Sequence, residues 1–242
     1  MANSVTNTQA RESILRSIRS NLASSVEHDE LEATGHGTSP AVSPIVPAEN
    51  GNAISTVELF KESLEAVNGH CIIVRNELEI VRALTKIITH VQTTNFRVRR
   101  IATSNAPALE RLVNLIAVEV EEVCVTPSAA DLFGVDVGVT TAQAAIAETG
   151  TLVLDSSRER NRLTSLVPPI HIAIVDACQI RQTLGETLSA LQSDTEVSPI
   201  VTFVTGPSRT GDIEMILTIG VHGPQELYVI VNEGPALVTN SI

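Results

Sequence analysis

Two segments in the second half of the chain hold the residue types that bind or transform ligands. Residues 135–166 and 204–223 both read as apolar strands that run into loops rich in small and hydroxyl residues. Their polar residues are Glu148, Thr149, Asp155, Ser208, Arg209, Thr210, Asp212 and Glu214. A loop that only turns the chain does not need Arg, Asp, Ser and Thr together, because each exposes polar groups able to bind a ligand. These loops are therefore the first candidates for a functional site.

The loop at residues 206–210 (GPSRT) has the composition of an anion-binding turn. Gly206 can adopt a positive φ or allow a ligand to approach the backbone closely. Successive backbone N–H groups, together with the hydroxyls of Ser208 and Thr210, can form a nest for an anion. Arg209 adds a planar fork that suits a carboxylate or a phosphate. We predict that Arg209 is the main anion-binding group of this loop.

The same loop also has a purely structural interpretation. It can be an ordinary helix start, in which Ser208 caps the helix and Asp212 and Glu214 favour its N-terminus. The residue types alone leave both interpretations open.

A cluster of arginines supports a binding site in the same half of the chain. Arg158, Arg160 and Arg162 fall within five residues of an otherwise acidic region. Surface charges that only keep a protein in solution are normally scattered, whereas a local positive cluster can select a small carboxylate or phosphate. The alternative is that these arginines form salt bridges with Asp155, Glu159 and their neighbours.

Glu148 and Asp212 are the two candidates for catalytic acids. Glu148 follows an apolar strand, so burial is expected, and a buried carboxyl group is rarely free. Either the Thr149 and Gly150 backbone and an arginine hydrogen-bond it, or its pKa is raised for proton transfer. Thr149 is a further candidate ligand-binding residue beside it.

Two histidines lie in or beside predicted strands. A single histidine in a strand, such as His171, is more often a core residue than a ligand. His222 stands between two glycines in GVHGP, and a binding role and a structural role are equally open for it. No spacing of histidines and acids resembles a metal site, and no dinucleotide, Walker A, zincin or nucleophile-elbow motif is present. We predict neither a metal nor a cofactor.

Composition excludes several classes of protein. A formal net charge of −12 and 2% aromatic residues disfavour a nucleic-acid binder, which needs a basic face or stacking aromatics. No run of about 18 apolar residues is present to span a membrane, and the first 20 residues do not resemble a secretory signal. Cys71, Cys124 and Cys178 stand singly within apolar stretches, which predicts buried strand thiols in a reducing cytosol. We therefore expect a cytoplasmic protein.

The apolar pattern predicts an α/β fold. Helices are expected at 54–67, 77–91, 106–116 and 179–193, and strands at 70–75, 97–103, 117–125, 170–175 and 199–205, with strand-rich residues at 135–154 and a last pair of strands near 219–232. Strands that alternate with helices of 10–15 residues indicate a mostly parallel sheet with helices on its faces. Ligands of such sheets bind beyond the carboxyl ends of the strands, where we expect the polar loops to lie.

The chain divides into three parts by composition. Residues 1–22 form an N-terminal extension with an amphipathic helix at 9–22, and residues 23–53 have the polar composition of a flexible linker. Residues 54–242 form one α/β domain. The helix either docks on a neighbouring chain or packs on its own domain.

Three motifs together resemble one known family. AIAETGT at 145–151, GPSRT followed by Asp212 and Glu214, and GVHGP at 220–224 recur in this order in the LUD-domain family, in its lactate-utilization protein C (YkgG-type) branch. The resemblance spans about residues 55–232 and a short basic amphipathic N-terminal helix. Gly211 departs from the pattern, because alanine is more usual there, and it loosens the backbone of the turn.

The resemblance implies a NagB/RpiA/CoA-transferase-like fold and a function. The chain would be a component of a system that oxidises L-lactate to pyruvate, binding a substrate or cofactor or assembling a complex. The resemblance also implies partner proteins that carry iron–sulfur clusters. This chain has three cysteines, so it cannot hold an all-cysteine cluster by itself, since such a cluster needs four thiolates. Two alternatives stay open. One is a free-standing acyl-transferase-like or isomerase-like enzyme that uses Glu148 or Asp212, and the other is a non-catalytic interaction subunit.

Overall fold

The structure is a computed structural model, and it describes most of the chain after residue 54. The described residues are 16, 55–93, 97–104, 106–116, 120–125, 127–156, 162–193, 199–211, 217–219 and 223–237. All but residue 16 belong to a compact unit, Asn52–Ile242. Apart from that one residue, the predicted helix at 9–22 and the linker at 23–53 lie outside the described residues and stay predictions.

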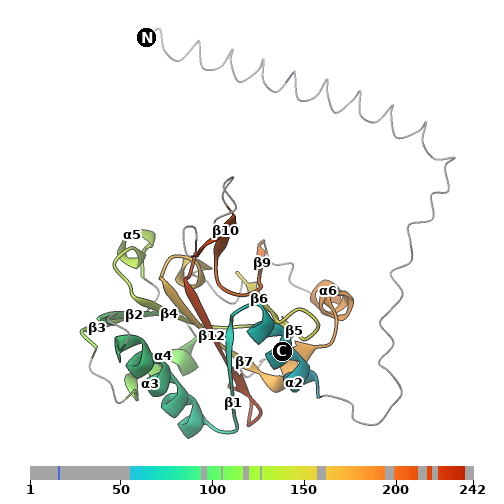
Figure 1. Cartoon of the computed structure of the whole chain (residues 1–242), viewed down its shortest axis with the longest axis horizontal. Helices are drawn as coiled ribbons and strands as arrows, with labels where there is room; N and C mark the ends of the chain where they lie inside the picture. The colour runs from blue at the N-terminus through green and yellow to red at the C-terminus, as the bar shows by residue number, and fades with distance from the viewer. Residues whose placement is uncertain are drawn as a thin grey trace, which may run out of the picture. The chain divides into compact units, whose positions relative to one another are not determined.

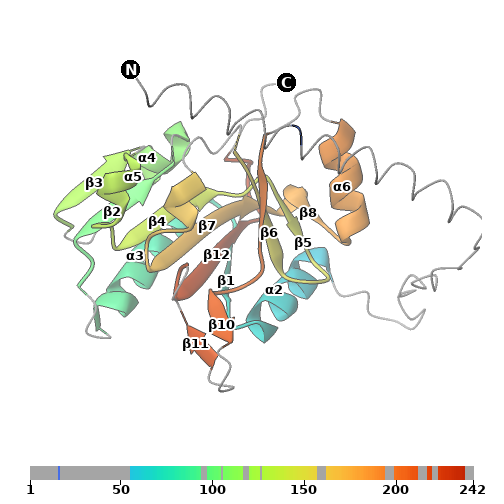
Figure 2. The same cartoon turned by 90° about the horizontal axis from the view of Figure 1, so that it is seen from above.

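A six-stranded parallel sheet forms the centre of this unit, in the order β1-β12-β7-β4-β2-β3 (Figure 2). The strands are β1 (His70–Val74), β2 (Arg100–Thr103), β3 (Glu122–Val125), β4 (Val137–Thr141), β7 (Ile170–Asp176) and β12 (Glu226–Asn232). Every residue of β4 and β7 is buried. Burial of every residue along a strand is typical of a sheet that is covered on both faces.

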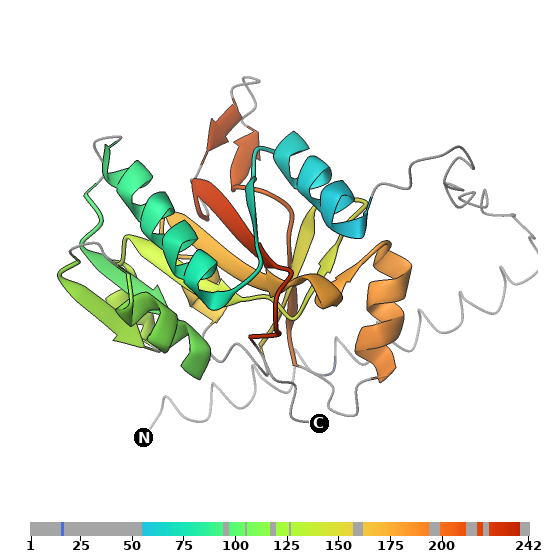
Figure 3. The same cartoon turned by 90° about the horizontal axis from the view of Figure 1, so that it is seen from below.

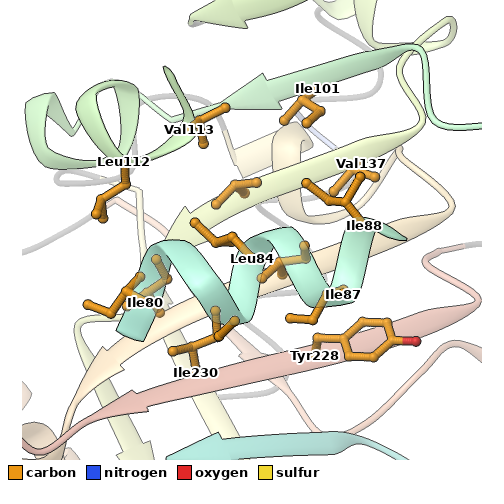
Figure 4. Packing of buried hydrophobic residues seen from close by; sticks show 14 of the residues in the cluster. Ile80, Leu84, Ile87, Ile88, Ile101, Leu112, Val113, Val137, Tyr228 and Ile230 are labelled. Carbon is orange, nitrogen blue, oxygen red and sulfur yellow. The ribbon is translucent and has the colours of Figure 1, made fainter. Parts of the chain in front are cut away.

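Helices α3 (Glu77–Thr93) and α4 (Pro107–Asn114) cover one face of the sheet (Figure 3). Four apolar residues of α3, namely Ile80, Leu84, Ile87 and Ile88, recur at helical spacing and are buried. They pack with β12 and with the neighbouring strands in one apolar cluster (Figure 4). Asn76 starts α3, since its side-chain oxygen accepts from the Glu79 N–H at 2.9 Å.

Helix α2 (Thr56–Ala66) and a second, smaller sheet cover the opposite face. Ser55 and Glu58 form a capping box at the start of α2, which directs Phe60 and Leu64 into the apolar cluster. The second sheet has the order β8-β5-β6-β9. Its strands are β5 (Ala144–Ile146), β6 (Thr151–Asp155), β8 (Ile180–Arg181) and β9 (Val201–Val204).

Short elements complete this side of the molecule. Two of them, α5 (Ala129–Leu132) and the 3-10 helix η1 (Arg162–Ser165), lie on the face of β2, β4 and β7. A second 3-10 helix, η2 (Ala177–Gln179), joins β7 to β8. Helix α6 (Leu184–Ser193) packs on the second sheet (Figure 1). Strands β10 (Arg209–Gly211) and β11 (Leu217–Ile219) form a separate antiparallel hairpin.

The predicted α/β class and the mostly parallel central sheet are confirmed, with two corrections. The strand expected at 199–205 is β9, which pairs antiparallel with β6 in the second sheet and not with the parallel sheet. The helix expected at 179–193 begins only at Leu184, because Ile180 pairs with Ala145 as a strand. Within the described ranges, no helix is long and apolar enough to cross a membrane.

Candidate ligand-binding site

Three of the loops singled out by sequence meet at the end of helix α2. We call residues 148–151, 205–209 and 223–224 the motif loops. Gly206 has a φ of 82°, and a Cβ there would lie 2.8 Å from the carbonyl oxygen of Val67, the C-cap residue that follows α2. Only glycine fits this approach without strain. The backbone N–H of Ser208 donates to the carbonyl oxygen of Pro224 at 2.8 Å, which joins the second loop to the third.

Hydroxyl groups join the first loop to the second. The Oγ1 atoms of Thr149 and Thr151 are 2.7 Å apart, and Thr151 Oγ1 is also 2.7 Å from Thr205 Oγ1. Thr151 is buried, whereas the other two threonines are exposed. Pairing of Leu152 with Val204 sets this contact, because it places the start of β6 beside the end of β9. The result is a chain of three hydroxyls that opens to solvent at both ends.

Arg209 is held at the same place. Its Nη2 donates to the carbonyl oxygen of Val67 at 2.7 Å, while the side chain as a whole is exposed. Helix α2 has no basic residue in its last turn, so Arg209 supplies the positive charge that favours a helix C-terminus. A guanidinium has five N–H donors. The bond to Val67 therefore fixes the group and leaves donors that can reach an anion.

The structure contradicts one alternative and one expectation about the second motif loop. Residues 209–211 form strand β10, so GPSRT does not start a helix there. The loop also does not lie beyond the carboxyl ends of the parallel strands. It contacts the end of α2, just before β1, and Pro224, two residues before β12 begins. The reason is that β9, the strand that leads into it, belongs to the second sheet.

Glu148 is exposed, so the expectation that it is buried among apolar residues is wrong. Its Oε1 accepts from the backbone N–H of Leu184, the first residue of α6, at 2.7 Å. Its own backbone N–H donates to the carbonyl oxygen of Gln182 at 3.1 Å. A carboxylate at a helix N-terminus is a common structural arrangement. Glu148 thus ties the β5–β6 turn to α6 through a helix N–H, and no arginine among the described residues pairs with it.

The remaining predicted residues are not all brought to this place. Arg162 is exposed at the start of η1, which packs against β4, β7 and α5. Thr210 pairs with Thr218 in the β10–β11 hairpin. Arg158, Arg160, Asp212 and His222 lie outside the described residues, as does Glu214, so their predicted roles stay predictions.

A buried polar pair that the sequence analysis missed lies at the carboxyl ends of β7 and β12. Asn232 Nδ2 donates to Asp176 Oδ1 at 2.7 Å, and both residues are almost fully buried. The carboxylate of Asp176 also accepts from the backbone N–H of Leu237. This pair anchors the segment that follows β12. The sequence signal was a polar residue that ends an apolar strand on each side, IVD and IVN.

A second missed group lies beneath η1. Thr140 Oγ1 and His171 Nε2 are 2.9 Å apart, and both residues are buried. Burial lowers the pKa of His171 to about 4, so its imidazole is neutral at pH 7. Within the described part of the chain, four buried side-chain atoms find no hydrogen-bond partner: Thr103 Oγ1, Ser104 Oγ, Thr164 Oγ1 and His171 Nδ1. Each such atom costs free energy unless something pairs with it.

The three cysteines are well separated in the fold. Cys71 lies on β1 and Cys124 on β3, both partly buried, but Cys178 lies on η2 and is exposed, so its prediction as a buried strand thiol is wrong. Among the residues that the structure describes, no group of three or more His, Cys, Asp and Glu side chains is arranged to hold a metal.

The fold and the motif loops define a class of protein: a parallel α/β domain whose second sheet carries small-residue and hydroxyl-rich loops to one helix end. The sequence profile of the LUD domain matches residues 57–231, which covers more than half of the chain. The chain therefore belongs to the LUD domain family, and the family predicted from its motifs is confirmed.

Individual relatives agree with this assignment. Lactate utilization protein C of Bacillus licheniformis is 39% identical over 103 residues, which are 40% of this chain and 43% of that protein. Lactate utilization protein C of Deinococcus radiodurans is 40% identical over 105 residues, which are 43% and 50% of the two chains. The matched segment thus spans half or less of these relatives. A crystal structure of a DUF162 family protein from Deinococcus radiodurans aligns with a TM-score of 0.55 and 26% identity, covering 74% of this chain and 99% of that one.

Proposed function

We propose that this protein is a component of a lactate-utilization system that oxidises L-lactate to pyruvate, and that it binds a small anion, or an acidic group of a partner, through Arg209. The observation that carries the proposal is the convergence of the motif loops on an exposed guanidinium that is fixed by the Val67 carbonyl. Family membership and the names of the relatives supply the metabolic context. At the level of the fold, we infer a NagB/RpiA/CoA-transferase-like arrangement of the domain.

The geometry around Arg209 suits recognition of an anion. A guanidinium that is already held by one hydrogen bond loses less freedom when it binds a ligand. A charge-assisted hydrogen bond to a carboxylate contributes roughly 1.5–3 kcal/mol, which corresponds to about a ten- to a hundredfold change in affinity. The hydroxyls of Thr149 and Thr205 lie on the neighbouring motif loop and can accept or donate further hydrogen bonds.

Electron transfer is the reason to propose partner proteins. Oxidation of a 2-hydroxy acid to a 2-oxo acid releases two electrons and two protons, and an acceptor must take the electrons. The chain has three cysteines in all, on β1, β3 and η2, so it cannot supply the four thiolates of a cysteine-ligated cluster by itself. We therefore propose iron–sulfur proteins as its partners in the reaction.

Two other functions are weighed against this one. A free-standing acyl-transferase-like or isomerase-like enzyme would need Glu148 or Asp212 as nucleophile or base, and the bond from Leu184 to the exposed Glu148 favours a structural role for that acid. A non-catalytic interaction subunit gains support from exposed apolar side chains on and beside the second sheet, Leu184, Leu188 and Phe203. Such a subunit would bind its partners without binding the substrate.

Substitution of Arg209 tests the proposal. The variant Arg209→Gln should fold but fail to restore lactate-dependent growth in a strain that lacks the native gene, because the anion loses its guanidinium partner. Growth on another carbon source and the melting temperature are measured alongside. Arg181→Gln is the matched control, since Arg181 is an exposed arginine on β8. Unchanged growth with a lowered melting temperature in Arg209→Gln would show that Arg209 only caps α2.

A further inference from the structure

The face of the sheet beneath η1 carries a small polar layer among apolar neighbours. Alternation along a strand places every second side chain on this face. The strand register forms two adjacent rows, the first of Ala102, Gly138 and His171 and the second of Ser104, Thr140 and Ala173. Small residues thus flank the polar ones, which lets η1 approach the sheet closely.

Helix η1 closes over this layer at Gly138. A Cβ on Gly138 would clash with the carbonyl oxygen of Thr164, so the absence of a side chain there lets η1 approach the sheet directly. Thr164 is fully buried as a result. Its hydroxyl therefore faces a dry interior and has no hydrogen-bond partner among the described residues.

Unpaired groups concentrate in this one layer. Ser104 Oγ, Thr164 Oγ1 and His171 Nδ1 all lie on the η1 side of the sheet, all belong to residues with no exposed surface, and none has a partner in the described structure. A buried polar atom left unpaired destabilises the folded state. Three such atoms on one side of the sheet are groups with which a ligand oxygen could pair, because hydroxyls and a neutral imidazole can both donate and accept.

The course of the chain also favours this place. After β2 the chain continues into α4, on the face that α3 covers, whereas after β4 it continues into β5 on the opposite face. In open parallel sheets, ligands bind where the chain leaves adjacent strands on opposite faces. Ser104 directly follows β2, and Thr140 is the second-last residue of β4. The layer therefore reaches the position where the fold itself predicts a ligand.

Arg162 supplies the charge that the layer lacks. It is exposed at the start of η1, two residues before Thr164. A carboxylate at Arg162 would keep its charge near water while the rest of a short acid reached inward. We propose that the layer of Ser104, Thr140, Thr164 and His171, with Arg162 at its rim, binds a small 2-hydroxy or 2-oxo carboxylate: Arg162 takes the carboxylate, and the unpaired groups take the oxygen on carbon 2.

This site is distinct from Arg209, and it rests on the proposed function for the choice of a 2-hydroxy or 2-oxo acid as its ligand. Its four inner residues are buried, so the acid enters only when η1 moves away from Gly138. Once η1 returns, the carbon-2 oxygen gains partners that propionate, which lacks this oxygen, cannot use. Selectivity between lactate and propionate is therefore the property that identifies the site.

Nitrogen-15 NMR of the histidine rings in the full-length protein tests the proposal. The His171 resonances are recognised because they do not titrate from about pH 5.5 to 8, as expected for a pKa of about 4. L-lactate and pyruvate should each shift the Nδ1 resonance of His171 in a saturable manner. Propionate should need a concentration about tenfold higher or more. Equal responses to all three acids, or no saturable response to any, would overturn the proposal and leave buried water as the partner of these groups.

Two variants separate binding from folding. Thr164→Val removes an unpaired hydroxyl at nearly constant volume, so it should raise or maintain the melting temperature while weakening the lactate response about tenfold. Arg162→Gln should weaken the lactate response by a similar factor. Thr89→Val, at an exposed position on α3, should leave the lactate response unchanged. An undiminished response in both site variants contradicts the proposal. If Arg209→Gln loses growth and His171 does not respond to lactate, only the site beneath η1 is contradicted. If Arg209→Gln keeps growth and His171 responds to lactate, only the proposed role of Arg209 is contradicted.

Discussion

Burial gives the three thiols of this protein different chemistry. Cys71 lies on β1 beneath α2, where burial raises its pKa to about 12. The pKa of Cys124 is also raised, first by burial and then by its hydrogen bond with Glu122. Cys178 lies exposed on η2. Because the thiolate is the nucleophile, only a small fraction of Cys71 is reactive near neutral pH.

We expect Cys178 to react first with a thiol reagent such as iodoacetamide at about pH 8. At a pKa of about 12, the thiolate fraction of Cys71 at that pH is on the order of one in ten thousand. Peptide mass mapping over time measures the order of modification. In Cys178→Ser the fast phase should disappear, whereas Cys71→Ser, the matched control, should keep it. Fast modification of Cys71 in the folded protein would show that α2 opens readily from β1.

At the level of single residues, part of the candidate site could be predicted from the sequence. It predicted that Arg209, Gly206 and Thr149 belong to one functional region, because their residue types are unusual for turns; the structure brings their loops together, and their function stays a prediction. It misjudged Glu148, since an apolar strand before an acid does not show whether the next turn emerges into solvent. The pair of His171 and Thr140 could not be predicted from the sequence, because the two residues come together only through the register of β4 and β7.

At the scale of elements, the motif loops depend on how closely β6 approaches α2. Gly150 has a φ of 63°, and a Cβ there would clash with the backbone of α2 at Ser63 and Leu64. This one glycine lets the β5–β6 turn sit against the helix. The helix in turn presents the Val67 carbonyl to Arg209. Packing of a turn against a helix thus sets the position of the guanidinium.

Replacement of Gly150 with alanine should destabilise the protein by more than about 1 kcal/mol, because the backbone conformation and the close approach both disfavour a Cβ. Gly185→Ala is the matched control. Gly185 lies in the first turn of α6 with space around it, so alanine there should stabilise the protein by up to about 1 kcal/mol. Urea denaturation measures the free energy of unfolding of both variants. Equal stability of the two variants would mean that α2 and the turn adjust freely, and that Arg209 is not held as described.

The elements themselves were predictable to different degrees. Helices α2 and α3 and strands β1 and β7 follow directly from apolar periodicity, and the prediction placed them within a few residues. The second sheet was not predictable in the same way. Strands β5 and β8 are short, and β9 pairs with β6 across some 50 residues of chain. Such non-local pairing leaves no periodic signal, and for that reason the GPSRT loop was expected at the wrong edge of the fold.

At the scale of the whole molecule, the buried neutral His171 links stability to pH. The chain has a net charge of −12, so mild acidification removes negative charge from it. Protonation of an exposed carboxylate changes the free energy of unfolding only slightly. His171 differs because it is fully buried and burial alone lowers its pKa to about 4. Its protonation must therefore be coupled to unfolding of the central sheet to which β7 belongs.

The sign of this coupling is fixed by the two pKa values. An unfolded histidine has a pKa of about 6.5, so between about pH 6.5 and 4 the unfolded chain binds more protons than the folded one. The free energy of unfolding should therefore fall as the pH is lowered through this window, by on the order of 3 kcal/mol in total from His171. Carboxylates add to the loss in the lower part of the window. Urea denaturation at a series of pH values measures the slope.

Two variants separate the contribution of His171 to the pH dependence of stability from that of the other titratable groups. His171→Gln should be less stable at pH 7 but should lose much of the slope between about pH 6.5 and 5, because glutamine does not titrate. His90→Gln, at an exposed position on α3, should keep the slope of the wild type. If the wild type and His171→Gln instead show the same slope, His171 protonates without unfolding the sheet. The layer beneath η1 would then be open to water, and water would pair with its three unpaired atoms in place of the ligand oxygen.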